Sequence, residues 1–160
     1  MKFQLPVTVK IGALLLGTTA MYTYIGQLVP QKEVQAPVVI ELAEDLSTGE
    51  MVDIGREIFR GKGLCSTCHT IGKSGALRFP DLDGIGTRAS TQVENLSELE
   101  YLAQSLYEPD AFVVPGFNPG MKVPKDLSDQ EILAVIAYLQ SLGGTPSVTM
   151  QTDVGYSRGG

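Results

Sequence analysis

The chain has 160 residues, of which 43% are apolar and 19% charged, enough for one modest domain with appendages. Its 12 basic and 18 acidic residues give a net charge of -6, which argues against binding to nucleic acid through phosphate neutralisation. Its two cysteines, Cys65 and Cys68, are too close together to staple a fold, and the single histidine, His69, excludes zinc motifs that need two histidines.

The N-terminal segment has the pattern of a membrane helix. Lys2 and Lys10 precede 19 consecutive uncharged positions, residues 11–29, which would span about 28 Å as a helix. This predicts a single N-terminal transmembrane helix within residues 1–29. The basic residues before it and the acidic residues after it predict a single-pass protein of the bacterial inner (cytoplasmic) membrane, with the main domain on the periplasmic, extracytoplasmic side. A cleaved signal peptide is the alternative interpretation.

The remaining chain divides into three parts. Residues 30–46 mix Pro30 and Pro37 with charges, which predicts a linker or stalk. Residues 47–143 are expected to form the main domain. Residues 144–160 form a polar tail that begins beside a Gly pair, and we expect this tail to be extended and ordered only where a partner holds it.

Within the main domain, three helix starts carry a capping-box pattern, a serine followed three residues later by a glutamate. They are Ser47-x-x-Glu50, Ser97-x-x-Glu100 and Ser128-x-x-Glu131. Apolar residues follow at helical spacing, so the sequence predicts an all-α domain with three main helices. The two Gly- and Pro-rich segments between the helices, residues 72–86 and 109–124, are too long for simple turns and are expected to wrap a ligand.

The chemistry concentrates in Cys65-Ser66-Thr67-Cys68-His69, a C-x-x-C-H run. Two thiols at this spacing can each form a thioether with one vinyl group of a porphyrin, while the adjacent imidazole approaches the iron. A zinc site would have at most three such ligands, and a thioredoxin-like redox pair would need a βαβ context that the sequence lacks. The run therefore predicts one covalently attached haem c.

His69 is the expected proximal ligand, and because the chain has no second histidine, bis-His ligation is excluded. The sixth position is then filled by Met or Lys, or stays open. Met121 is the expected ligand because it stands in a Gly- and Pro-rich loop 52 residues after His69, with a helix between them. Lys122 and an open position remain as alternatives.

Taken together, these residues resemble the class I cytochromes c over roughly residues 55–142. The matches include Gly55-x-x-x-Phe59, the run from Val135 to Leu139, and Phe79-Pro80-Asp81-Leu82 followed by Gly84-x-Gly86-x-Arg88. The resemblance implies the class I cytochrome c fold, in which three main helices wrap one covalent haem. It implies that the Pro80 carbonyl orients His69 and that Arg88 pairs with a haem propionate. The chain as a whole resembles the monohaem subunit of alternative complex III.

The expected function is one-electron transfer, because filled axial positions leave no vacancy for a substrate, and no catalytic residues are predicted. The expected partners are the subunits of a membrane quinol-oxidising complex as donor and a soluble cytochrome, a copper protein or a terminal oxidase as acceptor. Two alternatives are a haem sensor or peroxidase-like protein with an open sixth position, and the cytochrome c subunit of a terminal oxidase. A basic rim around the haem edge is expected to steer an acidic partner; it comprises Lys62, Lys73, Arg78, Lys122 and Lys125.

Overall fold

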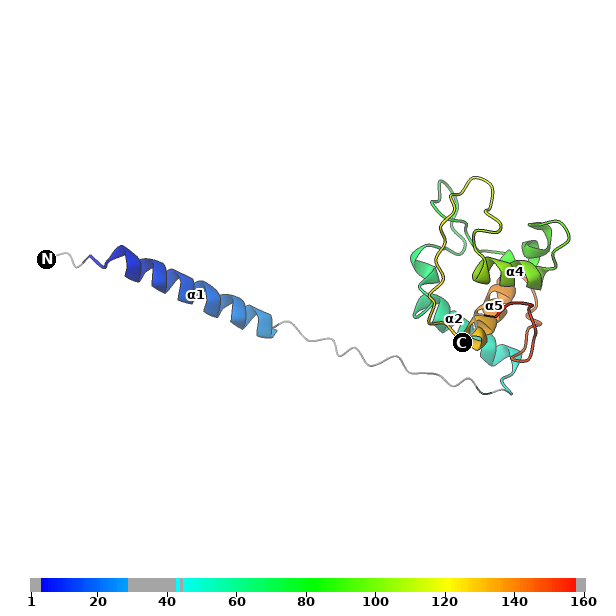
Figure 1. Cartoon of the computed structure of the whole chain (residues 1–160), viewed down its shortest axis with the longest axis horizontal. Coiled ribbons are helices and arrows are strands. Elements are labelled where there is room, and N and C mark those ends of the chain that lie inside the picture. The colour runs from blue at the N-terminus through cyan, green and yellow to red at the C-terminus, as the bar shows by residue number, and fades with distance from the viewer. Residues whose placement is uncertain (1–3, 29–42, 44, 158–160) are drawn as a thin grey trace. The chain divides into compact units, whose positions relative to one another are not determined.

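The computed structural model describes residues 4–28, 43 and 45–157. It divides into two units, Met1–Ile40 and Glu41–Gly160 (Figure 1). The described residues contain helices and no strands, as the sequence predicts for an all-α protein. The predicted stalk, residues 30–46, lies almost entirely outside the described residues.

The first unit contains helix α1, Val7–Leu28, whose apolar side chains are exposed. The prediction of a membrane-spanning helix, and with it a single-pass position in the bacterial inner membrane, is wrong. Among the described residues, no helix combines the length and the apolar character needed to cross a bilayer. The uncharged run, residues 11–29, misled because residues of low hydropathy interrupt its apolar ones; these are the glycines at positions 12, 17 and 26, the threonines at positions 18, 19 and 23, Tyr22, Tyr24 and Gln27.

The second unit is built on three main helices, α2 (Thr48–Arg60), α4 (Glu98–Tyr107) and α5 (Asp129–Ser141). All three begin with the predicted capping box, in which serine and glutamate side chains bond reciprocally to backbone N–H groups at the helix start. Local sequence therefore sets where each helix begins.

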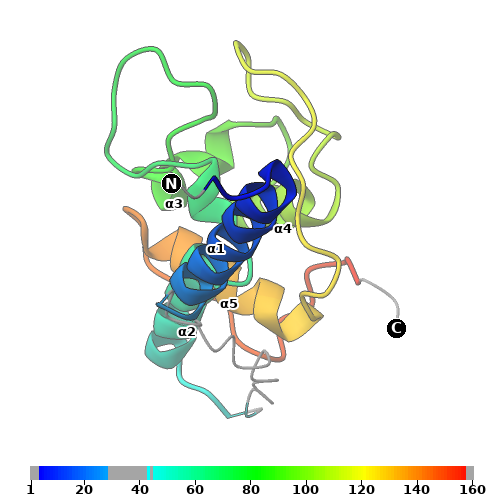
Figure 2. The ribbon, with the colours of Figure 1, turned by 90° about the vertical axis from the view of Figure 1, so that its left-hand side faces the viewer.

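Short helices fill the segments between them. They are the 3-10 turn η1 (Cys65–Thr67), the single-turn α3 (Ile85–Arg88) and the 3-10 turn η2 (Ala89–Thr91). Two long loops, near residues 70–80 and 112–124, leave this helical frame on the same side of the unit, as Figures 1 and 2 show in green and yellow. The two loops bring together residues that are far apart in the sequence.

Helices α2 and α5 cross in close contact, as the resemblance implies. A Cβ placed on Gly55 would come 1.9 Å from the Ala134 carbonyl oxygen, so only glycine allows the two backbones to approach this closely. Beside the crossing, the rings of Phe59 and Tyr138 meet edge to face with centroids 5.4 Å apart. This crossing fixes the helix pair that forms one wall of the site.

The C-terminal tail differs from the expectation. Val148 is fully buried and Met150 is 9% exposed, while the ring of Tyr156 stacks on that of Tyr107. The side-chain oxygen of buried Gln140 accepts hydrogen bonds from the backbone N–H groups of Ser147 and Val148, at 3.0 and 3.3 Å. The described part of the tail, residues 144–157, is thus held by its own chain, in part through Gln140 of α5. Val148 and Met150 enter the core, and Val154 and Tyr156 pack against it while partly buried.

Candidate functional site

A cavity of about 590 Å³ opens between the helical frame and the two long loops. All six residues predicted for the site line this cavity: Cys65, Cys68, His69, Pro80, Arg88 and Met121. Its apolar wall comes from the main helices and includes Phe59, Leu102, Leu106, Val135 and Leu139. Folding therefore gathers residues from four separate stretches of the chain around one apolar space.

The C-x-x-C-H run forms a tight turn at one side of the cavity. The backbone N–H groups of Cys68 and His69 both bond to the Cys65 carbonyl, at 3.1 and 2.8 Å. Both cysteines are free thiols, and burial raises the pKa of the Cys65 thiol. The turn thus presents two thiol sulfurs and one imidazole to the same cavity.

His69 is held by its Nδ1 atom, which lies 2.9 Å from the carbonyl oxygen of Pro80. A carbonyl oxygen only accepts hydrogen bonds, so Nδ1 carries the proton and donates it. In the neutral ring, Nε2 is then the nitrogen with the free lone pair, and this tautomer is the one that binds iron through Nε2. This contact has the geometry that the resemblance implies for Pro80.

Met121 lies in the second long loop and is half-buried. Among the described residues, it is the one methionine that lines the cavity. Met51 and Met150 are buried in the core, and Lys122, the alternative ligand, is exposed and absent from the cavity wall. The Met121 loop is held from one side by Asp110, whose carboxylate accepts a hydrogen bond of 3.0 Å from the Gly120 N–H.

Arg88 lines the cavity, but its guanidinium donates to the backbone carbonyls of Asp81 and Asp83. These bonds tie α3 to the segment that follows Pro80. Pairing with a haem propionate stays a prediction.

The family model described as cytochrome c matches residues 52–143, more than half of the chain. The chain belongs to the cytochrome c family. Among curated proteins, none matches it. Membership implies a covalently bound haem c and an electron-transfer protein rather than an enzyme.

The residues of this cytochrome c fit the implied haem. Two free thiols at the C-x-x-C spacing, an imidazole held through Nδ1 by the Pro80 carbonyl and a methionine all line one apolar cavity. A porphyrin is a flat apolar group, and the aliphatic and aromatic wall suits it. Cys65, Cys68, His69 and Met121 are therefore the residues that would hold the group.

Three features of the site were missed at the level of sequence. The sequence assigns no role to Asp81, but its carboxylate accepts four hydrogen bonds, three of them from residues 70–73, directly after His69. Asp110 holds the Met121 loop, and Tyr101 lines the cavity, where burial raises the pKa of its hydroxyl. Only Asp81 had a local signal, because Asp-x-Asp-Gly is a sequence in which the first aspartate bonds to the backbone two residues later.

Proposed function

We propose that this cytochrome is a one-electron carrier with a single haem c, attached through Cys65 and Cys68 and ligated by His69 and Met121. The observation that carries the proposal is the convergence of these four residues on one apolar cavity. When bound, the haem supplies a reversible ferric–ferrous couple whose potential methionine ligation raises.

The chain's own residues would serve that couple in three ways. The apolar wall, with Leu102, Leu106 and Leu139, excludes water and so lowers the reorganisation that accompanies a change of charge. The Pro80 carbonyl fixes the tautomer of His69 and makes Nε2 a stronger donor. Met121 would occupy the ligand position that His69 leaves free and so keep small ligands away from the iron.

Substitution of Met121 tests the ligation. The ferric holoprotein should show the weak near-infrared absorption band of Met–iron bonding, and Met121→Ala should lose it. Lys122→Ala is the matched control and should keep the band. A band that survives Met121→Ala, or one that Lys122→Ala removes, would contradict the proposed ligand. If the sixth position were open, the wild-type protein would lack the band and Met121→Ala would leave the spectrum unchanged. That result would favour a sensor or peroxidase-like function.

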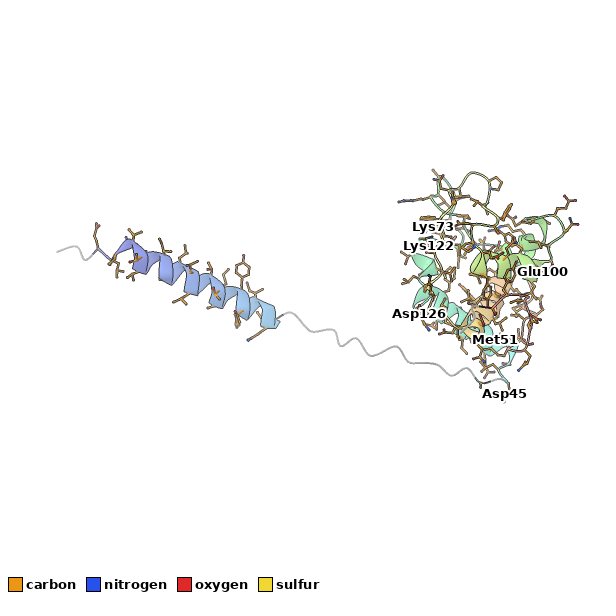
Figure 3. All side chains as sticks on the ribbon, in the orientation of Figure 1. Asp45, Met51, Lys73, Glu100, Lys122 and Asp126 are labelled. Carbon is orange, nitrogen blue, oxygen red and sulfur yellow. The ribbon has the colours of Figure 1, made fainter. Side chains whose placement is uncertain are left out.

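We also propose that a basic rim docks an acidic partner. Lys73, Arg78, Lys122 and Lys125 are exposed, and Arg78 also lines the cavity. Figure 3 places Lys73 and Lys122 in the loop-rich part of the unit, away from Met51. Lys62 is different, because it already forms an ion pair: its Nζ lies 2.8 Å from a carboxylate oxygen of Glu131.

The rim proposal predicts a salt-dependent rate. Charge reversal of Lys122 and Lys125 to glutamate should slow electron transfer to an acidic acceptor at low ionic strength. The difference should vanish at high salt, because screening removes the steering. An equal rate for both proteins at low salt would contradict the rim.

The narrower proposal is that the cytochrome serves a quinol-oxidising complex of the alternative complex III type and passes electrons to a soluble cytochrome, a copper protein or a terminal oxidase. What supports it is the resemblance of the chain as a whole to the monohaem subunit of that complex. Native purification, with identification of the co-migrating subunits, tests it. If the cytochrome is recovered with terminal oxidase subunits alone, it would instead be the cytochrome c subunit of a terminal oxidase.

A further inference from the structure

The carboxylate of Asp81 accepts four hydrogen bonds. Its donors are the Thr70 hydroxyl at 2.6 Å and the backbone N–H groups of Gly72, Lys73 and Asp83 at 3.0, 2.9 and 2.9 Å. These bonds, led by the one from Thr70, hold the pKa of Asp81 well below its usual range. Three of the four donors lie in residues 70–73, directly after His69.

These bonds close the base of the first long loop. The loop leaves at His69 and returns at Pro80, and Asp81 follows the return point. The Leu82 N–H also bonds to the Thr70 carbonyl, at 2.8 Å. Residues 71–76 are all exposed, so packing against the core contributes little to the loop's position. The contacts at its base therefore determine how the two ends of the loop are spaced.

We propose that Asp81 is a positioning residue for His69. The carboxylate holds residues 70–73 against residues 81–83, and this sets the separation between the His69 imidazole and the Pro80 carbonyl. The ring orientation, and the direction in which Nε2 points, follow from that separation. The inference rests on the proposed function, because it gives Asp81 its role through His69 as an iron ligand.

Removal of a carboxylate also removes a negative charge near the cavity, and this effect must be separated from positioning. Asp83 provides the matched control. It lies two residues away in the same segment and carries the same charge, and no hydrogen bond to its side chain occurs among the described residues. A substitution of Asp83 changes the charge and leaves the base of the loop intact.

The test uses the ferrous holoprotein and measures, by proton NMR, how fast the His69 Nδ1 proton exchanges with solvent. Asp81→Ala should accelerate exchange about tenfold or more, because the hydrogen bonds that close the loop are lost. Asp81→Asn should give a smaller acceleration, since its amide oxygen still accepts from Gly72 and Asp83. Asp83→Ala should exchange at the wild-type rate.

Slow backbone amides of α5, measured in the same samples, report global unfolding. Acceleration of the His69 proton beyond that of the α5 amides supports the proposal. Equal acceleration of both, or equal rates in Asp81→Ala and Asp83→Ala, would overturn it. If Asp81→Ala does not fold, the exchange rate of the His69 Nδ1 proton is compared between Asp81→Asn and Asp83→Asn. A faster rate in Asp81→Asn supports the proposal, and equal rates overturn it. In the wild type, His69 ring protons without the large ring-current shift of a haem ligand would instead refute the proposed function, independently of the Asp81 comparison.

Discussion

Gly55 lies directly against the backbone of Ala134, where an added Cβ would come 1.9 Å from the carbonyl oxygen. Gly55→Ala should therefore push α2 away from α5 and lower the free energy of unfolding by at least about 2 kcal/mol. Gly49→Ala is the control, because nothing lies within 4 Å of a Cβ at that position. Denaturant unfolding of the two variants measures the difference, and equal stabilities would contradict the close crossing.

The buried amide of Gln140 holds the C-terminal tail. In Gln140→Leu the backbone N–H groups of Ser147 and Val148 lose their acceptor. This loss should lower the free energy of unfolding by about 1 to 3 kcal/mol. Hydrogen exchange at the Val148 amide checks this locally, and we expect it to accelerate more than exchange in α2. An unchanged Val148 amide would show that the tail is held elsewhere.

The Asp110 carboxylate accepts from the Gly120 N–H, one residue before Met121. Asp110→Ala should release this side of the loop and weaken the attachment of the loop by about 1 to 2 kcal/mol, because one hydrogen bond is lost. The Met–iron band should therefore disappear at a lower temperature than in the wild type. Asp126→Ala, at an exposed aspartate five residues after Met121 in the sequence, is the matched control. Identical melting of the band in both variants would argue against a role for Asp110.

The pH dependence of stability should carry a contribution from Glu98. Burial raises the pKa of this carboxyl, a hydrogen bond from Gln140 opposes the shift, and one carboxylate oxygen is buried without a hydrogen-bond partner among the described residues. The folded state therefore binds the proton more tightly than the unfolded state. The Glu98 contribution to stability is present at low pH and is lost as pH rises from about 4.5 through the folded-state pKa.

Glu98→Gln should remove this loss of stability with rising pH, and it should raise the free energy of unfolding at neutral pH relative to the wild type. Thermal or denaturant unfolding between pH 4 and pH 7 measures it, with Glu94→Gln, at an exposed glutamate, as the control. Parallel curves for Glu98→Gln and the wild type would refute this contribution.

Features determined by neighbouring residues could be predicted from the sequence. The serine–glutamate pairs at Ser47, Ser97 and Ser128 act within one helical turn, and the two thiols of the C-x-x-C-H run lie within one tight turn. Met121 could be predicted because it stands in a Gly- and Pro-rich loop after His69, with a helix between them. The resemblance supplied Pro80, whose contact with His69 spans 11 residues and has no local signature.

What could not be predicted depends on packing between distant segments. The burial of Val148 requires a partner surface on α5 that only the folded chain forms, so a polar, Gly-rich tail resembled a disordered one. The hydrogen bonds of Asp81 join residues 8 to 11 positions apart and need the loop geometry. The N-terminal helix was misjudged for a different reason: counting uncharged residues overlooked the low hydropathy of threonine, tyrosine and glycine.

Exposure of the ferrous holoprotein to carbon monoxide tests the central claim most directly, since it asks whether both axial positions are filled. With His69 and Met121 as ligands, the absorption spectrum should not change when carbon monoxide is added at neutral pH, whereas Met121→Ala should bind it readily. Ready binding by the wild-type protein would show an open sixth position and contradict the assignment of this cytochrome as a simple electron carrier.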